Sequence, residues 1–410
     1  MMKYEKYKAS GIEWLGDIPT QWKIKRVKDL GVYQSGEYIN ANEFDEENPY
    51  PVYGGNSFRG YANKYNTEGD YVLIGRQGAL CGNINYGSGK FWATEHCVVV
   101  YHKRKINVKW LGELLRVMNL NQYATSTAQP GLSVEKIKRL ELPVPPPQEQ
   151  TAIAQYLDTK TQAIDKKINL LTTKIEYYKE LRKTIINNAV TKGLDKKVKL
   201  KESELGLVPC HWAIKRIKDV CNSIAGGTPQ TNIQEYWVGN IPWIPSGKVQ
   251  NNIVIAEIVE DYISKDALLK SSTKMAKRNS ILIALTGATC SNIGYLTFDT
   301  AINQSIVALS KIGNNLSEKY IYYLLISQRE KLRTLMTGGA QGGINQEDVK
   351  YFLIPFPPKQ EQTEIATYID AKTSTIDAII NNLQLTINNY YELRKTLIND
   401  VVTGKVKVTD

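Results

Sequence analysis

Two stretches of the chain share one long pattern of apolar and polar positions. The first runs from Gln148 to Thr191 and the second from Gln360 to Thr403, and they align without a gap, so that each residue has its counterpart 212 positions later. Apolar positions recur in alternating steps of four and three residues, which is typical of the seam of a coiled coil. The first seam is Ile153, Leu157, Thr161, Ile164, Ile168, Leu171, Ile175, Tyr178, Arg182, Ile185 and Ala189, and the second follows the same steps from Ile365 to Val401. We predict a duplicated long helix.

Each predicted helix is too long to be buried by one small globular domain. At a rise of about 1.5 Å per residue it extends over roughly 65 Å, and its apolar face needs a partner. Two such faces in one chain most simply cover each other. Because a whole domain of sequence separates the copies, we expect them to run antiparallel, with one globular domain at each end of the pair. Prolines at 145–147 and at 355, 357 and 358 mark the beginning of each helix.

The duplication extends beyond the helices. Leu15 and Leu205, 190 positions apart, each begin a Leu-Gly-x-(Ile/Val)-Pro-x-x-Trp motif, and the halves then diverge over about 120 residues with strand-like and short helical patterns. We expect an α+β fold with internal duplication and pseudo-two-fold symmetry. The predicted domains are two mixed α/β globular domains at 1–147 and 201–357, separated by an antiparallel pair of long helical spacers at 148–200 and 358–410.

Charge favours a polyanionic partner. The chain has 410 residues, a net charge of +11 and a pI near 9.1. Residues 1–200 hold 30 basic and 21 acidic side chains, whereas residues 201–410 hold 22 and 20, so a second DNA-binding half would depend more on hydrogen bonds than on bulk charge. No apolar run approaches membrane-spanning length and the N-terminus lacks a signal-peptide core, so we expect a cytoplasmic protein.

Motifs for catalysis and metal binding are weak or missing in the sequence. The segment Gly87–Lys90 resembles part of a phosphate loop, but it lacks the first glycine and the hydroxyl residue that would hold magnesium. We find no methyltransferase motif, and the three histidines and five cysteines have no metal-ligand spacing. Asp158, Asp165 and their counterparts Asp370 and Asp377 are expected on a solvated helix face. We therefore expect no catalytic residue and no metal site in this chain.

Several polar side chains are suited to contact nucleic acid. Arg59, Arg76 and Gln77 lie in or beside glycine-rich turns, and in the major groove Arg can pair with guanine and Gln with adenine. Lysines near Lys28 and Lys138 are better suited to contact phosphates, which position a protein without specifying sequence. For each residue the simpler interpretation is an ordinary surface group. The candidate DNA contacts are Arg59, Arg76, Gln77, Gln129, Lys136, Lys138, Thr228, Gln230, Thr286, Gln341 and Lys350.

Taken together, these motifs resemble the specificity subunit of a type I restriction-modification system. The resemblance rests on the paired openings, on the segments Pro51–Asn56 and Gly226–Pro229, and on Pro-Pro-x-Gln-Glu-Gln before each long helix. It also rests on Glu-Leu-Arg-Lys-Thr near each helix end, at Glu180 and Glu392. One departure is Gln129-Pro-Gly, where the second half has the more flexible Gln341-Gly-Gly.

The resemblance implies two target-recognition domains, each reading one half of a bipartite site in double-stranded DNA, with the helices fixing the gap. It further implies a non-catalytic subunit on which two methyltransferase subunits dock. S-adenosylmethionine would belong to those subunits, and ATP and magnesium to motor-nuclease subunits, of which up to two may join. Exposed aromatics favour interfaces, so the outward tyrosines on the helices are candidates for the methyltransferase contact. These are Tyr156, Tyr177, Tyr368 and Tyr391.

Two other interpretations belong to different classes of protein. One is a coiled-coil adaptor that does not contact DNA, and the other is a methyltransferase or nuclease with an unrecognised site. Sequence-independent binding by the assembled complex would favour the adaptor, whereas methylation or cleavage by the purified chain alone would favour the enzyme.

Overall fold

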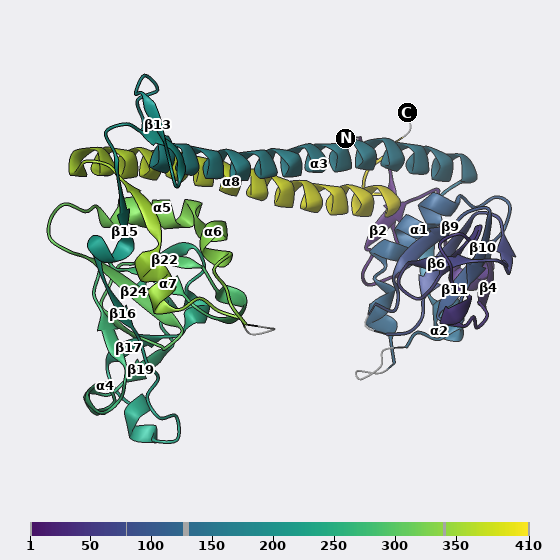
Figure 1. The fold of residues 1–410 in the computed structure, drawn as a ribbon. Coiled ribbons are helices and arrows are strands. Elements are labelled where there is room, and N and C mark those ends of the chain that lie inside the picture. The colour runs from purple at the N-terminus through teal and green to yellow at the C-terminus, as the bar shows by residue number, and fades with distance from the viewer. Residues whose placement is uncertain (1, 79, 126–130, 339–341, 409–410) are drawn as a thin grey trace. The chain divides into compact units, whose positions relative to one another are not determined.

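Two compact units make up the chain. The computed structural model describes residues 2–78, 80–125, 131–338 and 342–408 (Figure 1). The first unit comprises Met1–Thr172 and Gln384–Asp410, and the second comprises Thr173–Leu383. Each unit therefore contains one globular part and a portion of both long helices. The boundaries inferred from the sequence assign each helix to a spacer of its own, and that division stays a prediction.

The globular part of the first unit is built from short strands. Its four-stranded sheets have the orders β6-β5-β10-β7 and β4-β11-β8-β9, and the pairs β1-β2 and β12-β3 are formed separately. Helix α1 (Val108–Val117) packs on β8 and β9, and α2 (Val134–Arg139) packs on the short helix η1 (Val27–Asp29). The strands are β1 (Tyr7–Ala9), β2 (Asp17–Pro19), β3 (Lys23–Arg26), β4 (Gly31–Ser35), β5 (Tyr50–Tyr53), β6 (Phe58–Ala62), β7 (Thr67–Glu68), β8 (Tyr71–Gly75), β9 (Ile84–Gly87), β10 (Lys90–Ala93), β11 (Cys97–His102) and β12 (Glu141–Val144).

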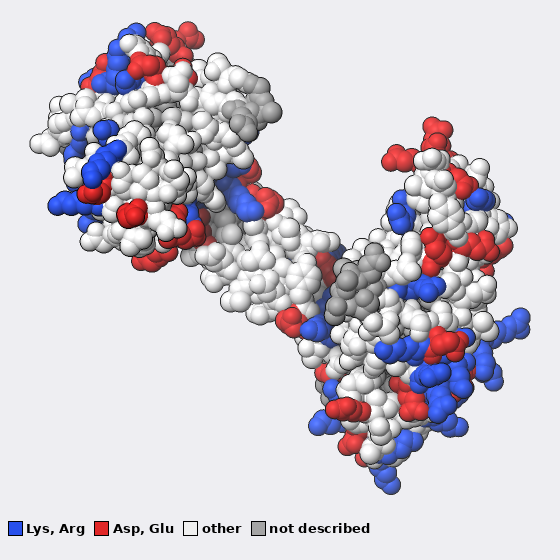
Figure 2. All heavy atoms as spheres, turned by 90° about the horizontal axis from the view of Figure 1, so that it is seen from below, with Lys and Arg blue, Asp and Glu red and all other residues white. Residues whose placement is uncertain are grey.

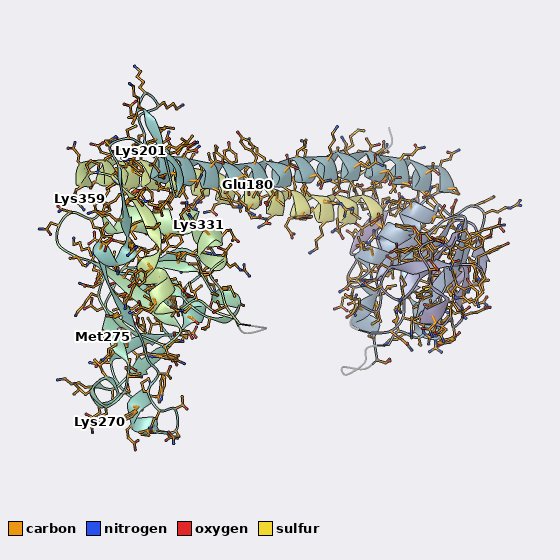
Figure 3. All side chains as sticks on the ribbon, in the orientation of Figure 1. Glu180, Lys201, Lys270, Met275, Lys331 and Lys359 are labelled. Carbon is orange, nitrogen blue, oxygen red and sulfur yellow. The ribbon has the colours of Figure 1, made fainter. Side chains whose placement is uncertain are left out.

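The second unit repeats this plan with additional elements. A five-stranded sheet has the order β16-β24-β21-β22-β18, and a four-stranded sheet has the order β19-β17-β23-β20. Figure 3 shows Lys270 at the end of α4 and Lys331 on α6 among the exposed side chains. The strands are β13 (Leu200–Ser203), β14 (Gly206–Pro209), β15 (Ala213–Arg216), β16 (Cys221–Ala225), β17 (Ile241–Ile244), β18 (Asn252–Val254), β19 (Asp261–Ile263), β20 (Lys274–Ala276), β21 (Ile281–Ala284), β22 (Ile293–Leu296), β23 (Thr300–Ile302), β24 (Ile306–Lys311) and β25 (Leu353–Phe356). The helices are α4 (Lys265–Lys270), α5 (Glu318–Ser327), α6 (Arg329–Arg333) and α7 (Gln346–Tyr351).

The central strands contain continuous apolar runs where both of their faces are covered. In the first unit β8 pairs antiparallel with β11, and residues 72–74 and 98–100 are all buried. In the second unit β21 pairs antiparallel with β24, and residues 281–284 and 306–309 are all buried. Such continuous apolar runs are typical of strands inside a core. The strand-like patterns of the diverged segments are confirmed as strands in both units.

The two long helices form over the predicted segments. Helix α3 extends from Pro147 to Lys192 and α8 from Lys359 to Val402 (Figure 1). Every predicted seam position is buried or half-buried, including Ile168 and Ile387, each 5% exposed. A seam that is covered in this way confirms the period of the sequence pattern.

Within each unit, equivalent charged residues pair between the helices. In the first unit Asp165 and Arg394 form an ion pair of 3.1 Å, and in the second Arg182 and Asp377 form one of 3.0 Å. The sequence pattern places these aspartates at a solvated rim, and their half-exposed side chains agree with that placement. It does not identify the arginines as their partners. The pairs show that the helix segments lie side by side within each unit.

A glutamate, buried in the first unit and half-buried in the second, joins each opening motif to the start of a long helix. The Trp22 indole donates to Glu149 at 3.1 Å, and the Trp212 indole donates to Glu361 at the same distance. Tyr4 provides a second donor to Glu149, whereas His211 lies 2.8 Å from Glu361. Gly404, at the end of α8, packs against Trp22, so the end of α8 lies beside the start of α3 in the first unit.

The glutamines that follow these glutamates fix the first turn of each helix. Gln150 accepts a hydrogen bond from the Asn107 amide and donates to the Pro145 carbonyl. Gln362 likewise accepts from the Ser317 amide and donates to the Pro357 carbonyl. Because backbone groups buried without partners are costly, the repeated Gln-Glu-Gln motif has a structural role in both units.

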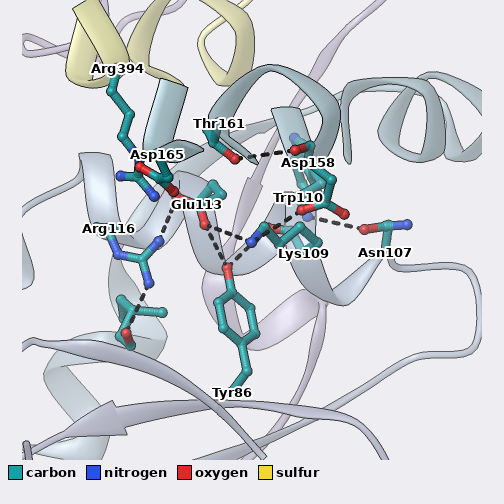
Figure 4. Close-up of polar contacts among 11 residues, drawn as sticks. Tyr86, Asn107, Lys109, Trp110, Glu113, Arg116, Asp158, Thr161, Asp165 and Arg394 are labelled. Atoms are coloured by element: carbon teal, nitrogen blue, oxygen red, sulfur yellow. Dashed lines mark hydrogen bonds and ion pairs between the residues drawn. The ribbon is translucent and has the colours of Figure 1, made fainter. Parts of the chain in front are cut away.

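A polar network fixes α1 to α3 in the first unit (Figure 4). Glu113, which is 3% exposed, pairs with Arg116 on α1 and accepts a hydrogen bond from Tyr86 at 3.1 Å. Lys109 lies 3.5 Å from Glu113 and 3.3 Å from Asp158 on α3. Burial raises the pKa of Glu113, but Arg116 and Lys109 outweigh burial and hold that pKa below its ordinary value. In the second unit Asp370 on α8 binds Lys319 and Tyr323 on α5.

Ile168→Asp should destabilise the protein because it buries a charge in the helix seam. We expect a loss of about 3–5 kcal/mol in the free energy of unfolding of the first unit, measured by denaturant unfolding. Leu170→Asp is the matched control, since Leu170 is 62% exposed on the same helix. Equal stability of the two variants would contradict a packed seam.

Glu113→Gln should remove a pH-dependent part of the stability. Because the folded-state pKa of Glu113 is lowered, its contribution is complete above its ordinary pKa and is lost as the pH falls through the folded-state value. The variant should therefore be less stable by about 1–2 kcal/mol near neutral pH, and the difference should shrink as the pH is lowered toward about 3. Chemical denaturation across this pH range measures it.

Glu135→Gln is the control, because Glu135 and Lys138 form an exposed pair with the same three-residue spacing as Glu113 and Arg116. It should leave stability nearly unchanged. If Glu113→Gln and the unmodified chain differed in free energy of unfolding by the same amount at all pH values, the ionised carboxylate would contribute nothing to stability.

Candidate nucleic-acid interface

Loops from four parts of the first unit meet in one cleft. The β5–β6 turn, the end of β8, the turn before β11 and the segment before α2 enclose a volume of about 460 Å³. Two predicted candidates, Arg59 and Gln77, lie in this lining, and both are exposed. We call this the first-unit cleft. Its lining residues are Gly55, Asn56, Arg59, Gln77, Gly78, His96 and Gly131.

Close backbone packing holds the β5–β6 turn against the sheet. A Cβ atom at Gly75 would lie 1.8 Å from the Gly55 carbonyl oxygen, so no other residue fits there without moving the turn. The Asn83 amide donates to the Asn56 side chain at 2.8 Å, and Asn85 donates to the Asn56 carbonyl at 2.9 Å. The turn that leads into Arg59 is therefore fixed from two sides.

Arg76 has different surroundings from its neighbour Gln77. Its guanidinium donates to the Ser35 hydroxyl at 2.8 Å and is half-buried. Gln77 forms an isolated backbone bridge with Gly131 and leaves its side chain exposed. The structure thus brings Arg59 and Gln77 together at the cleft, whereas Arg76 is bound by a protein partner.

Basic residues gather around α2 and η1. Pairing of β3 with β12, and a 2.8 Å bond from the Val27 amide to the Leu140 carbonyl, bring these segments together. Lys138 is partly neutralised by Glu135, and Lys136 is half-buried. Figure 2 shows Lys and Arg gathered on the surface of the first unit. We call this set the basic patch: Lys23, Lys25, Arg26, Lys28, Lys136, Lys138, Arg139 and Lys103–Lys105.

Lys103–Lys105 joins the patch through a contact that the sequence pattern does not reveal. The Lys103 amide donates to the Leu30 carbonyl at 2.8 Å, next to η1. Leu30 and Lys103 are far apart in sequence, so only the pairing of β4 with β11 indicates that they meet. The ten cations of the basic patch are suited to bind phosphates.

The corresponding loops of the second unit carry hydroxyls and amides. Thr286 donates to the Ser305 hydroxyl at 2.9 Å, and Thr228 donates to the side-chain oxygen of Gln304. Gln304 occupies the sequence position equivalent to His96. Gln230 is exposed nearby in the same loop as Thr228. These side chains offer donors and acceptors without charge.

Lys350 has an acidic partner on its own helix. It pairs with Glu347 at 2.6 Å on α7, which repeats the pair of Lys138 with Glu135 on α2. The candidates Gln129 and Gln341 lie outside the described residues.

The candidate partner-binding tyrosines differ in exposure. Tyr177 and Tyr391 are 64% and 54% exposed, whereas Tyr156 is half-buried. Tyr368 is 38% exposed and lines a groove of about 580 Å³ in the second unit, together with the end of α3 and the segment 193–200. Figure 3 labels Glu180 on α3 and Lys201 in the hairpin that follows this segment.

The described residues contain neither a candidate metal site nor a candidate membrane-spanning helix. Within those ranges no group of three or more His, Cys, Asp or Glu is placed to hold a metal ion. No helix in the described part of the chain is long and apolar enough to cross a membrane.

Comparisons with known proteins agree on one family. The family model described as "Type I restriction modification DNA specificity domain" matches residues 19–176 and again 209–389. The EcoprrI specificity subunit of Escherichia coli is 44% identical over 140 residues, which cover 33% of this chain and 35% of that protein. The MjaVIII specificity subunit of Methanocaldococcus jannaschii is 22% identical over 413 residues, which cover 95% of this chain and 94% of that protein.

Solved structures show the same fold at low sequence identity. A chain from a study of complex assembly and conformational transition of the type I R-M system has a TM-score of 0.75 at 15% identity, and the match covers 95% of this chain and 99% of that one. The HsdS subunit of Thermoanaerobacter tengcongensis has a TM-score of 0.57 at 15% identity, with 97% and 100% covered. The chain therefore belongs to the family of type I restriction-modification DNA specificity proteins, and it carries the specificity domain twice.

Proposed function

We propose that this chain is the DNA specificity subunit of a type I restriction-modification complex, in which each globular part reads one half of a bipartite site. One observation carries the proposal. The contacts that build the scaffold recur in both units, as with Trp22–Glu149 and Trp212–Glu361. The loops differ, because the first unit has a cleft with Arg59 and the loops of the second unit carry hydroxyls such as that of Thr286. Duplicated scaffolds with different loops suit the recognition of two different half-sites.

The long helices have two roles in this proposal. As an antiparallel pair with pseudo-two-fold symmetry they set the gap between the half-sites, and their exposed tyrosines contact two methyltransferase subunits. S-adenosylmethionine belongs to those subunits, and ATP with magnesium to motor-nuclease subunits that join the complex. The chain itself supplies recognition and assembly, with no catalytic step of its own. The adaptor without DNA contact is not favoured, because the matching family is described by DNA specificity.

The test is to map methylated adenines in cells that express this chain with its methyltransferase partner. We expect one bipartite motif with a fixed gap. Methylation without a sequence preference, with the complex shown to be assembled, would overturn the proposal. Methylation by the chain alone would show a catalytic role.

Shortening both helices by one heptad should shorten the gap. In the proposed antiparallel pair, the register of the ion pairs Asp165–Arg394 and Arg182–Asp377 would set residues 170–176 opposite residues 383–389. Removing both segments keeps the seam in register and shortens the pair by about 10 Å, which corresponds to roughly 3 base pairs. Methylome sequencing should then show unchanged half-sites with the shorter gap.

Removing only residues 170–176 is the control. Seven residues of α8 then lose their partners, and we expect assembly to fail rather than the gap to change. An unchanged gap in the doubly shortened chain would contradict the role of the helices in spacing.

A further inference from the structure

Arg59 is an exposed cation with no partner among the described residues. It lies in β6 at the first-unit cleft, and no described residue forms an ion pair or hydrogen bond with its guanidinium. Its aliphatic stem passes over Gly54, where an added Cβ would lie 2.5 Å from the Arg59 Cδ. The side chain is therefore positioned by packing, while its donors stay available.

The surroundings of Arg59 disfavour a phosphate and favour a neutral ligand. On its other side Arg59 lines a second cleft with Asp45 and Glu46. These carboxylates would repel a phosphate, and the Coulomb energy of like charges falls off only slowly with distance. The basic patch, by contrast, offers many cations to the DNA backbone. The edge of a base carries no net charge, so the two acidic residues do not repel it.

Gln77 supplies a second exposed polar group in the same cleft. The Gln77 side-chain amide has one donor and one acceptor, which suits the edge of adenine in the major groove. The Arg59 guanidinium has two parallel donors, which suit the edge of guanine. Arg76 does not share this role, because its side chain is half-buried and its Nη1 donates to the Ser35 hydroxyl.

We propose that the Arg59 guanidinium donates two hydrogen bonds to O6 and N7 of a guanine in the half-site read by the first unit. This inference rests on the proposed function and names the base at one position. In the second unit Thr228, Thr286 and Gln304 are uncharged. The loop after β17, which corresponds to the β5–β6 turn, carries Lys248, and Glu260 pairs with it at 2.5 Å. A guanine contact by an arginine fork is thus specific to one half-site.

The experiment uses the full chain assembled with its methyltransferase partner and synthetic duplexes that carry its methylated motif. Arg59→Ala should lower the discrimination of one G·C pair in one half-site by about 5- to 100-fold in equilibrium binding. The other half-site and the dependence of binding on salt should not change. Replacing that guanine by 7-deazaguanine, which lacks the N7 acceptor, should weaken binding of the unmodified complex and not of the Arg59→Ala complex.

Two variants keep the result interpretable. Arg59→Met keeps an aliphatic side chain over Gly54, so the packing of the turn is retained. It should lower the discrimination of the G·C pair as much as Arg59→Ala does. Thermal unfolding of both variants would reveal a folding defect. Lys28→Ala, in the basic patch, should weaken binding to all sequences equally and reduce the salt slope by about one.

Two outcomes would overturn the inference. One is an equal loss of affinity for all sequences with a reduced salt slope, which indicates a phosphate contact. The other is unchanged discrimination of the G·C pair in both Arg59 variants. Both differ from failure of the proposed function, in which the unmodified complex shows no preferred motif at all.

Discussion

A long amphipathic helix cannot bury its own apolar seam, and most of this structure follows from that constraint. Helices α3 and α8 each extend over more than forty residues, and each presents a continuous seam that only another helix of similar length covers. Apolar seams alone tolerate slippage by a turn. The ion pairs Asp165–Arg394 and Arg182–Asp377 are half-exposed and contribute little energy. They specify the register of the two helices, because a shift by one turn would separate both ion pairs.

The globular parts depend on the helices through buried polar contacts rather than through apolar surface alone. Glu149 is 9% exposed and accepts bonds from Trp22 and Tyr4. A buried carboxylate without donors costs several kcal/mol, so the opening motif has few orientations in which it can approach the helix. Lys109 and Asp158 add a second fixed point on the same helix. Two polar contacts at separated positions define an orientation, which is what a domain that reads DNA in a given register requires.

Features with a periodic pattern in the sequence could be predicted. Features that depend on the close approach of two backbone segments could not. The seam and both helix ends follow from spacing alone, within one or two residues. Arg59 and Gln77 could be named from their glycine-rich turns, but their common cleft depends on Gly75 packing against Gly55. Such a contact has no periodic signature. His96 enters the cleft by the same folding of the backbone and was not predicted.

Partners of charged residues were also beyond the sequence pattern. Asp158 was expected at a solvated or rim position of the helix seam, and the sequence pattern did not identify Lys109 of α1 as its partner. The sequence of Lys103–Lys105 does not show that this segment lies beside η1, and only the pairing of strands places it there. In both cases the interaction joins segments far apart in the chain, where charge alone does not say which of many candidates will meet.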